Sequence, residues 1–247
     1  MVRDLYNMLL VIVIAYLIGS VPFALILARR WGAVDLRRIG SGNLGAANVL
    51  RASGVRAGIL VAVLDVTKGA ASVFIAARLS PNAAATAVAG LAAIIGHIYP
   101  VWLRFRGGKG AATACGVFSV LTPLAVPPAL TVFVLTVWAT KYVSLGSILA
   151  SLALPPIAYA TGSPAPAVIA ACAAAMLIVF RHRSNLMRLR AGTERRLAPA
   201  ALASANARAR ASDSLEPLRG ANAPGHSGGG GAPPRLGNVG PREHREE

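Results

Sequence analysis

The sequence predicts an all-α integral membrane protein with seven transmembrane helices, an outside N-terminus, a cytoplasmic C-terminus and a disordered C-terminal tail. Of its 247 residues, 55% are hydrophobic and only 14% are charged, whereas soluble domains carry about 25% charged residues. The hydrophobic residues gather in runs, and the first of these is long enough to cross a bilayer. The cations collect at alternate junctions between these runs, and the positive-inside rule places those junctions in the cytoplasm.

The first predicted span covers residues 5–27 and is followed by four arginines. The polar, glycine-rich segment 40–51 comes next, and the second span covers residues 55–77. This span contains Asp65 and Lys68, which are three residues apart and therefore lie on one helical face, where they can pair. Because isolated charges inside a membrane are costly, we expect the pair to face the protein interior, either as a structural ion pair or as part of a site.

Five further spans are predicted before the tail. Residues 111–121 are too few to cross a bilayer alone, and such a half-helix is tolerated only where protein or water covers its ends. The span that contains Pro155 and Pro156 is expected to bend there. After the last span, a helix would place His182 and Asn185 on one face. The five segments are 83–99, 111–121, 129–140, 145–160 and 165–180.

The chain divides into a membrane-embedded domain, residues 1–195, and a tail, residues 196–247. The tail is rich in Ala, Arg, Gly and Pro. It cannot bury enough apolar surface to offset the entropy of ordering, so we expect it to be disordered. More than half of the arginines lie from Arg181 onward. No nucleic-acid partner is expected.

The stretch 96–113, G-H-I-Y-P-V-W-L-R-F-R-G-G-K-G-A-A-T, interrupts two apolar segments with cations and glycines. Gly107, Gly108 and Gly110 flank Lys109, and glycine lets backbone N–H groups approach a ligand closely. A helix is predicted directly afterwards, and its N-terminal end adds to the positive field. The stretch therefore predicts phosphate binding at a membrane surface. The alternative is a basic loop that only sets topology.

The predicted topology brings four polar stretches to the cytoplasmic side, near Ser41, Lys109, Ser144 and His182. Their cations, amides and hydroxyls suit phosphate-bearing ligands. No acidic cluster lies among them, and Glu194 is expected to be peripheral, which argues against a metal held by carboxylates. The histidines lack zinc-ligand spacing, so we expect neither metal nor cofactor. The shared face would contain Ser41, Asn43, Asn48, Arg51, His97, Lys109, Ser144, His182 and Asn185.

Five ordered patterns over residues 5–195 resemble the PlsY family of bacterial acyl-phosphate:glycerol-3-phosphate acyltransferases. One departure is Ala47, where the family usually has Thr, so one hydroxyl contact is missing here. In order, the patterns are G-S-G-N-x-G-x-x-N-x-x-R at 40–51, L-D-x-x-K-G at 64–69, G-H-x-x-P at 96–100 with G-G-K-G-x-x-T at 107–113, Y-V-S-L-x-S at 142–147, and R-H-x-x-N-x-x-R-L-x-x-G-x-E at 181–194.

The resemblance implies that an acyl group passes from acyl-phosphate to the 1-hydroxyl of sn-glycerol 3-phosphate, giving lysophosphatidate and phosphate, as the first acylation step of phospholipid synthesis. It implies a multi-pass protein of the bacterial inner membrane with a cytoplasmic active site, and a functional link to the enzyme that makes acyl-phosphate. Membrane lipid is the other expected partner. The alternative function is a membrane transporter of an organic phosphate, which usually has inverted repeats and a site at the bilayer midplane.

The same resemblance implies roles for individual residues. Arg51 and Lys109 would clamp phosphates, and with Ser41 and His182 they are the expected catalytic residues. Ser41 has a rival role as a helix cap, and for Ser144 this role is favoured over substrate contact. The general base is left open between His97, His182 and a phosphate oxygen of the substrate. The expected substrate-binding residues are Asn43, Gly45, Asn48, His97, Gly107, Gly108, Gly110, Thr113, Ser144 and Asn185, with the 107–110 backbone supplying N–H donors.

Overall fold

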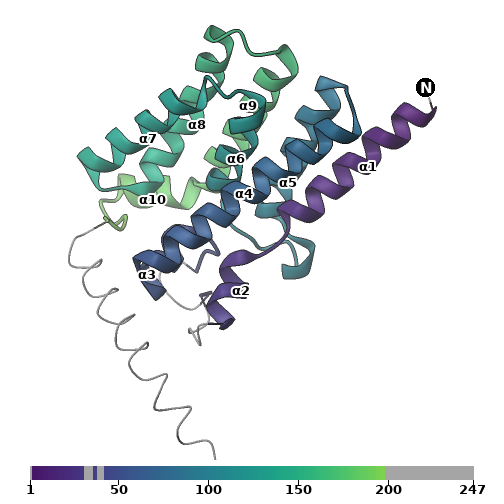
Figure 1. Cartoon of the computed structure of the whole chain (residues 1–247). Coiled ribbons are helices and arrows are strands. Elements are labelled where there is room, and N and C mark those ends of the chain that lie inside the picture. Colours follow the sequence, from purple (N-terminus) through teal and green to yellow (C-terminus); the bar gives the residue numbers. More distant parts are fainter. Residues whose placement is uncertain (1, 31–35, 38–41, 198–247) are drawn as a thin grey trace, which may run out of the picture. The chain divides into compact units, whose positions relative to one another are not determined.

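The computed structural model describes residues 2–30, 36–37 and 42–197, and this part of the chain contains only helices (Figure 1). All of it belongs to one compact unit. The predicted spans from residue 55 onward match observed helices, and the largest difference is the start of α7 at Val126 rather than at residue 129. The helices are α1 Val2–Gly19, α2 Phe23–Arg30, α3 Ala46–Ser53, α4 Val55–Leu79, α5 Ala83–Ile98, the 3₁₀ turn η1 Val101–Leu103, α6 Ala111–Leu121, α7 Val126–Thr140, α8 Val143–Ala160, α9 Ala165–Arg181 and α10 Arg183–Arg190.

The first predicted span is broken in the structure, because α1 ends at Gly19 and α2 begins at Phe23. Pro22 explains the break: proline has no N–H to continue the helical ladder, and it disfavours the helical conformation of the residue before it. The carbonyl of Val21, freed from the ladder, accepts a hydrogen bond of 2.9 Å from the Lys68 ammonium. The expected weak point in α8 did not break the helix, which continues through Pro155 and Pro156.

Four of the described helical segments are long and apolar enough to cross a membrane: Tyr6–Arg30, Val55–Leu79, Ala83–Leu103 and Val143–Ala160. A fifth is formed by α9 and α10 if this pair, bent by 55° at His182, counts as one span. The α6 and α7 helices are apolar but shorter, with 11 and 15 residues. Helix length alone therefore supports four or five spans, fewer than the seven predicted.

The helices lie on both sides of α4. Figure 1 shows α1 and α5 on one side of α4 and α7 and α8 on the other, and α9 packs against both α5 and α8. Glycines allow a close crossing between α4 and α6, because a Cβ on Gly69 would collide with the Thr113 carbonyl and one on Gly116 with the Val66 carbonyl. The α7 helix packs along α8 but hardly contacts α6. The space between the α4–α6 pair and the α7–α8 pair holds the candidate site.

Candidate active site

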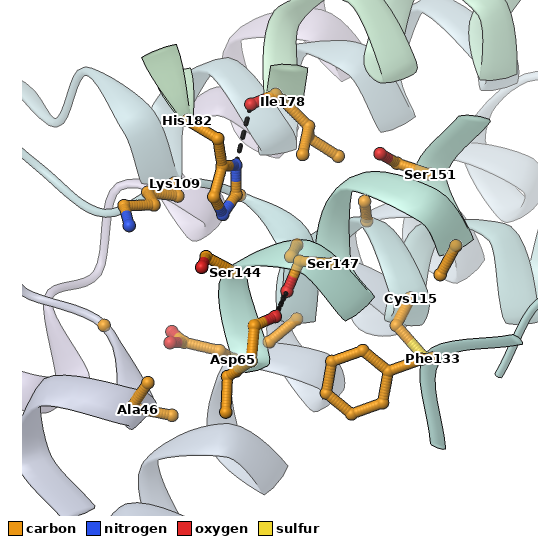
Figure 2. Close-up of a pocket in the computed structure, with 18 of the residues that line it drawn as sticks. Ala46, Asp65, Lys109, Cys115, Phe133, Ser144, Ser147, Ser151, Ile178 and His182 are labelled. Atoms are coloured by element: carbon orange, nitrogen blue, oxygen red, sulfur yellow. Dashed lines mark hydrogen bonds between the residues drawn. The ribbon is translucent and has the colours of Figure 1, made fainter. Parts of the chain in front are cut away.

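A cavity of about 600 Å³ lies among α3, α4, α6, α7, α8 and α9. Figure 2 shows side chains from several of these helices pointing into it, with Lys109 and His182 toward one end and Phe133 and Cys115 toward the other. Polar and charged groups line the first end, and apolar groups line most of the remainder. The polar end is formed by Asn43, Asn48, Arg51, Lys109, Ser144, His182, Asn185, Arg188 and Glu194.

Lys109 stands directly before α6. Gly110 has a φ of +88°, a left-handed conformation that favours glycine, and it turns the chain into the helix. The Lys109 ammonium donates a hydrogen bond of 2.6 Å to the Asn185 side-chain oxygen. Burial, with the charges of nearby arginines, lowers the pKa of Lys109 to about 8, although the charge of Glu194 opposes this. The side chain is therefore largely protonated at neutral pH, where it can attract an anion.

Glu194 is central to the polar end, so the expectation that it is peripheral is wrong. Its carboxylate accepts hydrogen bonds from the Ser144 hydroxyl at 2.8 Å, the Asn185 amide at 2.7 Å and the Arg188 Nε at 2.7 Å. Burial alone would raise the pKa of this carboxyl group, but the three hydrogen bonds and the Arg188 charge hold it below its ordinary value. By accepting from the Asn185 amide nitrogen, Glu194 keeps the amide oxygen turned toward Lys109.

The segment 191–197 carries Glu194 from the end of α10 toward the α7–α8 junction. The Leu197 N–H donates to the Lys141 carbonyl at 2.7 Å, and the Arg196 guanidinium donates to the Tyr142 hydroxyl at 3.1 Å. Arg51, which also lines the cavity, donates a long hydrogen bond of 3.5 Å to the Arg195 carbonyl. Residues just beyond the last helix therefore close one wall of the site.

His182 lies at the bend between α9 and α10 and is only 3% exposed. Its Nδ1 atom is 2.8 Å from the Ile178 carbonyl oxygen, as Figure 2 shows. A carbonyl only accepts hydrogen bonds, so Nδ1 carries the proton in the neutral ring and Nε2 keeps its lone pair. Nε2 has no hydrogen-bond partner among the described residues. Burial and the charge of Lys109 lower the pKa of His182 to about 4. The ring is therefore neutral at neutral pH, and Nε2 can accept a hydrogen bond from a hydroxyl group in the cavity.

The glycine loop, residues 107–110, was predicted to donate backbone N–H groups to phosphate, and the structure shows other partners for two of them. The N–H of Gly107 donates to the Ile98 carbonyl at 3.0 Å, and the N–H of Gly108 donates to the His97 carbonyl at 3.1 Å. Neither glycine lines the cavity. Both N–H groups are thus used within the protein, which does not support their predicted role as phosphate donors. Glycine is needed for space instead, because a Cβ on Gly107 would collide with the His97 carbonyl and one on Gly108 with the His97 ring.

The free N–H donors of this region lie one turn later. No acceptor among the described residues bonds the N–H groups of Ala111, Ala112 and Thr113, the first turn of α6. Ala111 and Ala112 line the cavity together with Gly110, so this helix end opens into it. The Thr113 side chain is fully buried away from the cavity, and its hydroxyl lacks a hydrogen-bond partner among the described residues. Its expected contact with substrate is therefore not supported.

The structure describes only part of the first sequence pattern, residues 40–51. Ser41 lies outside the described residues. Arg51, Asn43 and Gly45 line the cavity, and Arg51 projects from the short α3 helix. Burial lowers the pKa of Arg51, but an arginine remains charged at neutral pH. Asn48 also lines the cavity, and its amide donates a hydrogen bond of 3.0 Å to the Leu36 carbonyl, which fixes the chain before α3.

The remainder of the cavity is an apolar groove whose walls come from α4, α6, α7, α8 and α9. Figure 2 shows Phe133 reaching into it from α7. A groove of this character accommodates a hydrocarbon chain, while the polar end accommodates phosphate. Sequence reasoning missed this groove, because apolar residues that face a ligand look like those that face lipid. Its walls are formed by Ala62, Val66, Cys115, Phe118, Val126, Ala129, Leu130, Phe133, Leu154, Ala171, Ala174, Ala175 and Ile178.

Comparison with known proteins connects this geometry to a family. The glycerol-3-phosphate acyltransferase family matches residues 9–192. The chain is 49% identical over 185 residues to the glycerol-3-phosphate acyltransferase of Syntrophotalea carbinolica, covering 74% of this chain and 93% of that protein. For the enzyme of Geobacter sulfurreducens, the identity is 44% over 190 residues, covering 77% of this chain and 97% of that protein.

Two solved structures show the same fold. Both are of PlsY, an integral membrane glycerol 3-phosphate acyltransferase. The glycerol 3-phosphate form matches with a TM-score of 0.74 and 38% identity, covering 77% of this chain and 96% of that chain. The lysophosphatidic acid form matches with a TM-score of 0.73 and 36% identity, covering 79% and 97%. The chain therefore belongs to the glycerol-3-phosphate acyltransferase family of integral membrane enzymes, the family of PlsY.

Proposed function

We propose that this protein transfers an acyl group from acyl-phosphate to the 1-hydroxyl of sn-glycerol 3-phosphate, releasing lysophosphatidate and inorganic phosphate. The observation that carries the proposal is that one cavity combines a cationic end with an apolar groove. The cationic end suits the phosphates of both substrates, and the groove suits the acyl chain. The glycerol 3-phosphate and lysophosphatidic acid forms of the PlsY structures support the same acceptor and product.

The reaction needs positioning and charge stabilisation more than strong activation, since an acyl-phosphate is already an activated acyl donor. The acceptor hydroxyl oxygen forms a bond to the acyl carbon, and the bond from that carbon to the phosphate oxygen breaks. Negative charge passes to the departing phosphate. Lys109, with the free N–H groups at the start of α6, is placed to neutralise this charge, and Arg51, which lines the same end of the cavity, is placed to hold the second phosphate.

The proton of the acceptor hydroxyl must also be accommodated. We assign it to His182, because Nε2 of this ring keeps a free lone pair while the Ile178 carbonyl fixes Nδ1. The alternative acceptor of this proton is a phosphate oxygen of the substrate. Ser41 and the amides of Asn43 and Asn185 complete the proposed substrate contacts. His97 is a weaker candidate for the base, because its side chain is buried beside Asp65 and Gly108.

The proposal places seven helices in the membrane, with the N-terminus outside and the site on the cytoplasmic side of a bacterial inner membrane. At a rise of 1.5 Å per residue, α6 is about 16 Å long, so it would span only half a bilayer, starting at Lys109. The convergence of stretches near residues 43, 109, 144 and 182 on one cavity supports the predicted placement of these junctions on one side. Acyl-phosphate would come from a separate enzyme.

The decisive experiment uses purified protein in detergent with acyl-phosphate and glycerol 3-phosphate. Phosphate release should match lysophosphatidate formation one to one. Omitting glycerol 3-phosphate should abolish lysophosphatidate, and a chelator should change nothing. Replacing acyl-phosphate with acyl-CoA of the same chain length should give no product. Equal turnover with acyl-CoA, or phosphate release without acylated product, would refute the proposed donor or the proposed transfer.

A further inference from the structure

A buried ionic cluster of Asp65, Lys68 and His97 lies beside the loop 107–110, and the reaction proposed above assigns it no step. Asp65 and His97 form part of the cavity wall, whereas Lys68 does not line the cavity. Asp65 on α4 lies 2.8 Å from the Lys68 ammonium and 3.5 Å from Nδ1 of His97 on α5. Their side chains are only 3%, 4% and 7% exposed. Ionic groups at this depth are costly unless they are paired, and they commonly serve a specific role.

Lys68 ties the cluster to the break in the first span. Its ammonium donates to the Val21 carbonyl at 2.9 Å while it contacts Asp65. It also lies over the Phe23 ring, 5.7 Å from the ring centre. A continuous α1–α2 helix would engage the Val21 carbonyl in its own ladder. The break at Pro22 therefore supplies a partner that fixes Lys68.

His97 ties the cluster to the glycine loop. Its ring lies so close to Gly108 that a Cβ at that position would collide with Nε2, and its backbone carbonyl accepts the Gly108 N–H. Arg181 secures the same peptide from α9 by donating to the Gly108 carbonyl at 3.4 Å. The next residue is Lys109. The position of the His97 ring therefore determines where the backbone carrying Lys109 can lie.

We propose that Asp65 and Lys68 are positioning residues that act through His97 to hold the Gly108–Lys109 backbone. They thereby determine where the Lys109 ammonium lies in the polar end of the cavity. Asp65 orients the imidazole, and Lys68 fixes Asp65 against the α1–α2 break. In this scheme His97 supports the loop instead of contacting substrate. The kinetic part of the proposal rests on the function proposed above, whereas the placement of Lys109 does not.

The alternative is an ion pair that only stabilises the fold. The chain offers a measurement that separates the two, because it has only three lysines, Lys68, Lys109 and Lys141. Acetic anhydride at limiting concentration acetylates accessible, unprotonated amines, and peptide mass spectrometry reports each lysine separately. Lys141 is exposed and serves as the standard within each molecule.

In the Asp65→Asn variant we expect the acetylation rate of Lys109, relative to Lys141, to rise at least threefold, because the loop is no longer held in place. The matched control is Ser72→Ala, which removes a buried hydrogen bond to the Lys68 carbonyl from the same helix and should leave the ratio unchanged. Two further variants make the test independent of whether Asp65→Asn folds. His97→Asn keeps a polar atom near the Nδ1 position and His97→Gln one near Nε2, and both should raise the ratio.

An unchanged Lys109 ratio in the folded Asp65 and His97 variants overturns the proposal. In the acyl transfer assay, Asp65→Asn should lower kcat at least tenfold at saturating substrates, because a displaced Lys109 ammonium no longer neutralises the departing phosphate, while KM for glycerol 3-phosphate changes less than threefold. Adding Asp65→Asn to His97→Gln should produce no further change, because the first residue acts through the second. Additive effects would show that the two act separately. If wild-type protein transfers no acyl group, the proposed function fails, and the labelling result still decides the positioning role.

Discussion

The chemistry proposed for the polar end depends on the charge and position of Lys109. Its ammonium is fixed by the Asn185 oxygen, and Asn185 is fixed in turn by Glu194. A cation that is already held in place does not have to reorganise when charge develops on a departing phosphate. This arrangement explains why a single lysine can matter in a cavity that also contains Arg51 and Arg188.

Replacing Lys109 with alanine should lower kcat about 10²–10³-fold, the usual loss when one positioned electrostatic contact is removed. Lys109→Arg should restore only part of the activity, because a planar guanidinium cannot occupy the space of an ammonium. The measurement is kcat of purified, monodisperse protein at saturating substrates. If Lys109 only set topology, the purified alanine variant would turn over normally and only its abundance would fall.

The pKa of about 8 for Lys109 gives a second residue-scale prediction. The ammonium is present below this pH and is lost as the pH rises through it. We therefore expect kcat/KM, which reports the free enzyme, to fall above about pH 8. Lys109→Arg should lack this alkaline fall, because its guanidinium stays charged. An identical alkaline fall in both proteins would assign it to another group.

Sequence reasoning identified the cations and amides of the site but not how they interact. The pattern G-G-K-G predicted a phosphate loop, whereas the Gly107 and Gly108 N–H groups bond the end of α5. Spacing cannot show this, because the acceptor carbonyls belong to a helix end whose position relative to the loop depends on the fold. Glu194 was likewise misjudged, because its partner Ser144 is 50 residues away in sequence.

At the scale of elements, the crossing of α4 and α6 determines where the N-terminus of α6 lies in the polar end of the cavity. Gly69 and Gly116 let the two helices approach to backbone contact. The α6 helix also carries the N-terminal donors and follows Lys109 directly. A change in this crossing would therefore displace the donors as well as weaken the packing.

Gly116→Ala should destabilise the protein by about 1–3 kcal/mol, the usual cost of overpacking, because the new Cβ meets the Val66 carbonyl. Thermal unfolding in detergent should show a lower Tm. Ser119→Ala, on an exposed face of the same helix, is the control and should unfold like wild type. A Gly116→Ala protein as stable as this control would contradict the close crossing.

Most helices could be predicted from hydropathy and from the glycines and prolines at their ends. The range 111–121 for α6 follows from Gly110 before it and the proline-rich turn after it, and the structure confirms it. The break at Pro22 was missed, because the apolar run continues through it and hydropathy does not record backbone hydrogen bonds. The paired Asp65 and Lys68 were expected from their spacing and are confirmed at 2.8 Å, but their link to Val21 depends on that break.

For the whole molecule, the proposed orientation can be tested with a single engineered thiol. In a Cys115→Ser, Cys172→Ser background, a cysteine introduced at Gly225 should resist an impermeant thiol reagent added to intact cells and react after the cells are broken open. Both results follow from a cytoplasmic C-terminus, which the cation-rich junctions predict. Labelling of intact cells would reverse the orientation.

The boundary of the catalytic domain gives a second whole-molecule prediction. Truncation after Ala198 keeps the Leu197 contact with Lys141, so kcat should stay within about twofold of wild type. Truncation after Thr193 removes Glu194 and should abolish turnover. Loss of the distal arginines should also weaken binding to vesicles rich in phosphatidylglycerol, because each basic residue near an anionic surface contributes about 1 kcal/mol. Abolished turnover in a folded Ala198 truncation would place the tail in the site.

The hydrogen bonds between Glu194, Asn185 and Ser144 also have a consequence for protein synthesis. The membrane helices are translated first, and the carboxylate that orders the polar end is among the last residues of the domain to be made. A chain whose synthesis stops just before residue 194 would contain all the helices from α1 to α10. Its polar end would still lack the carboxylate that orders Asn185 and Ser144. The cell would then hold a membrane-inserted fragment unable to compete with the finished enzyme for scarce phosphorylated substrates.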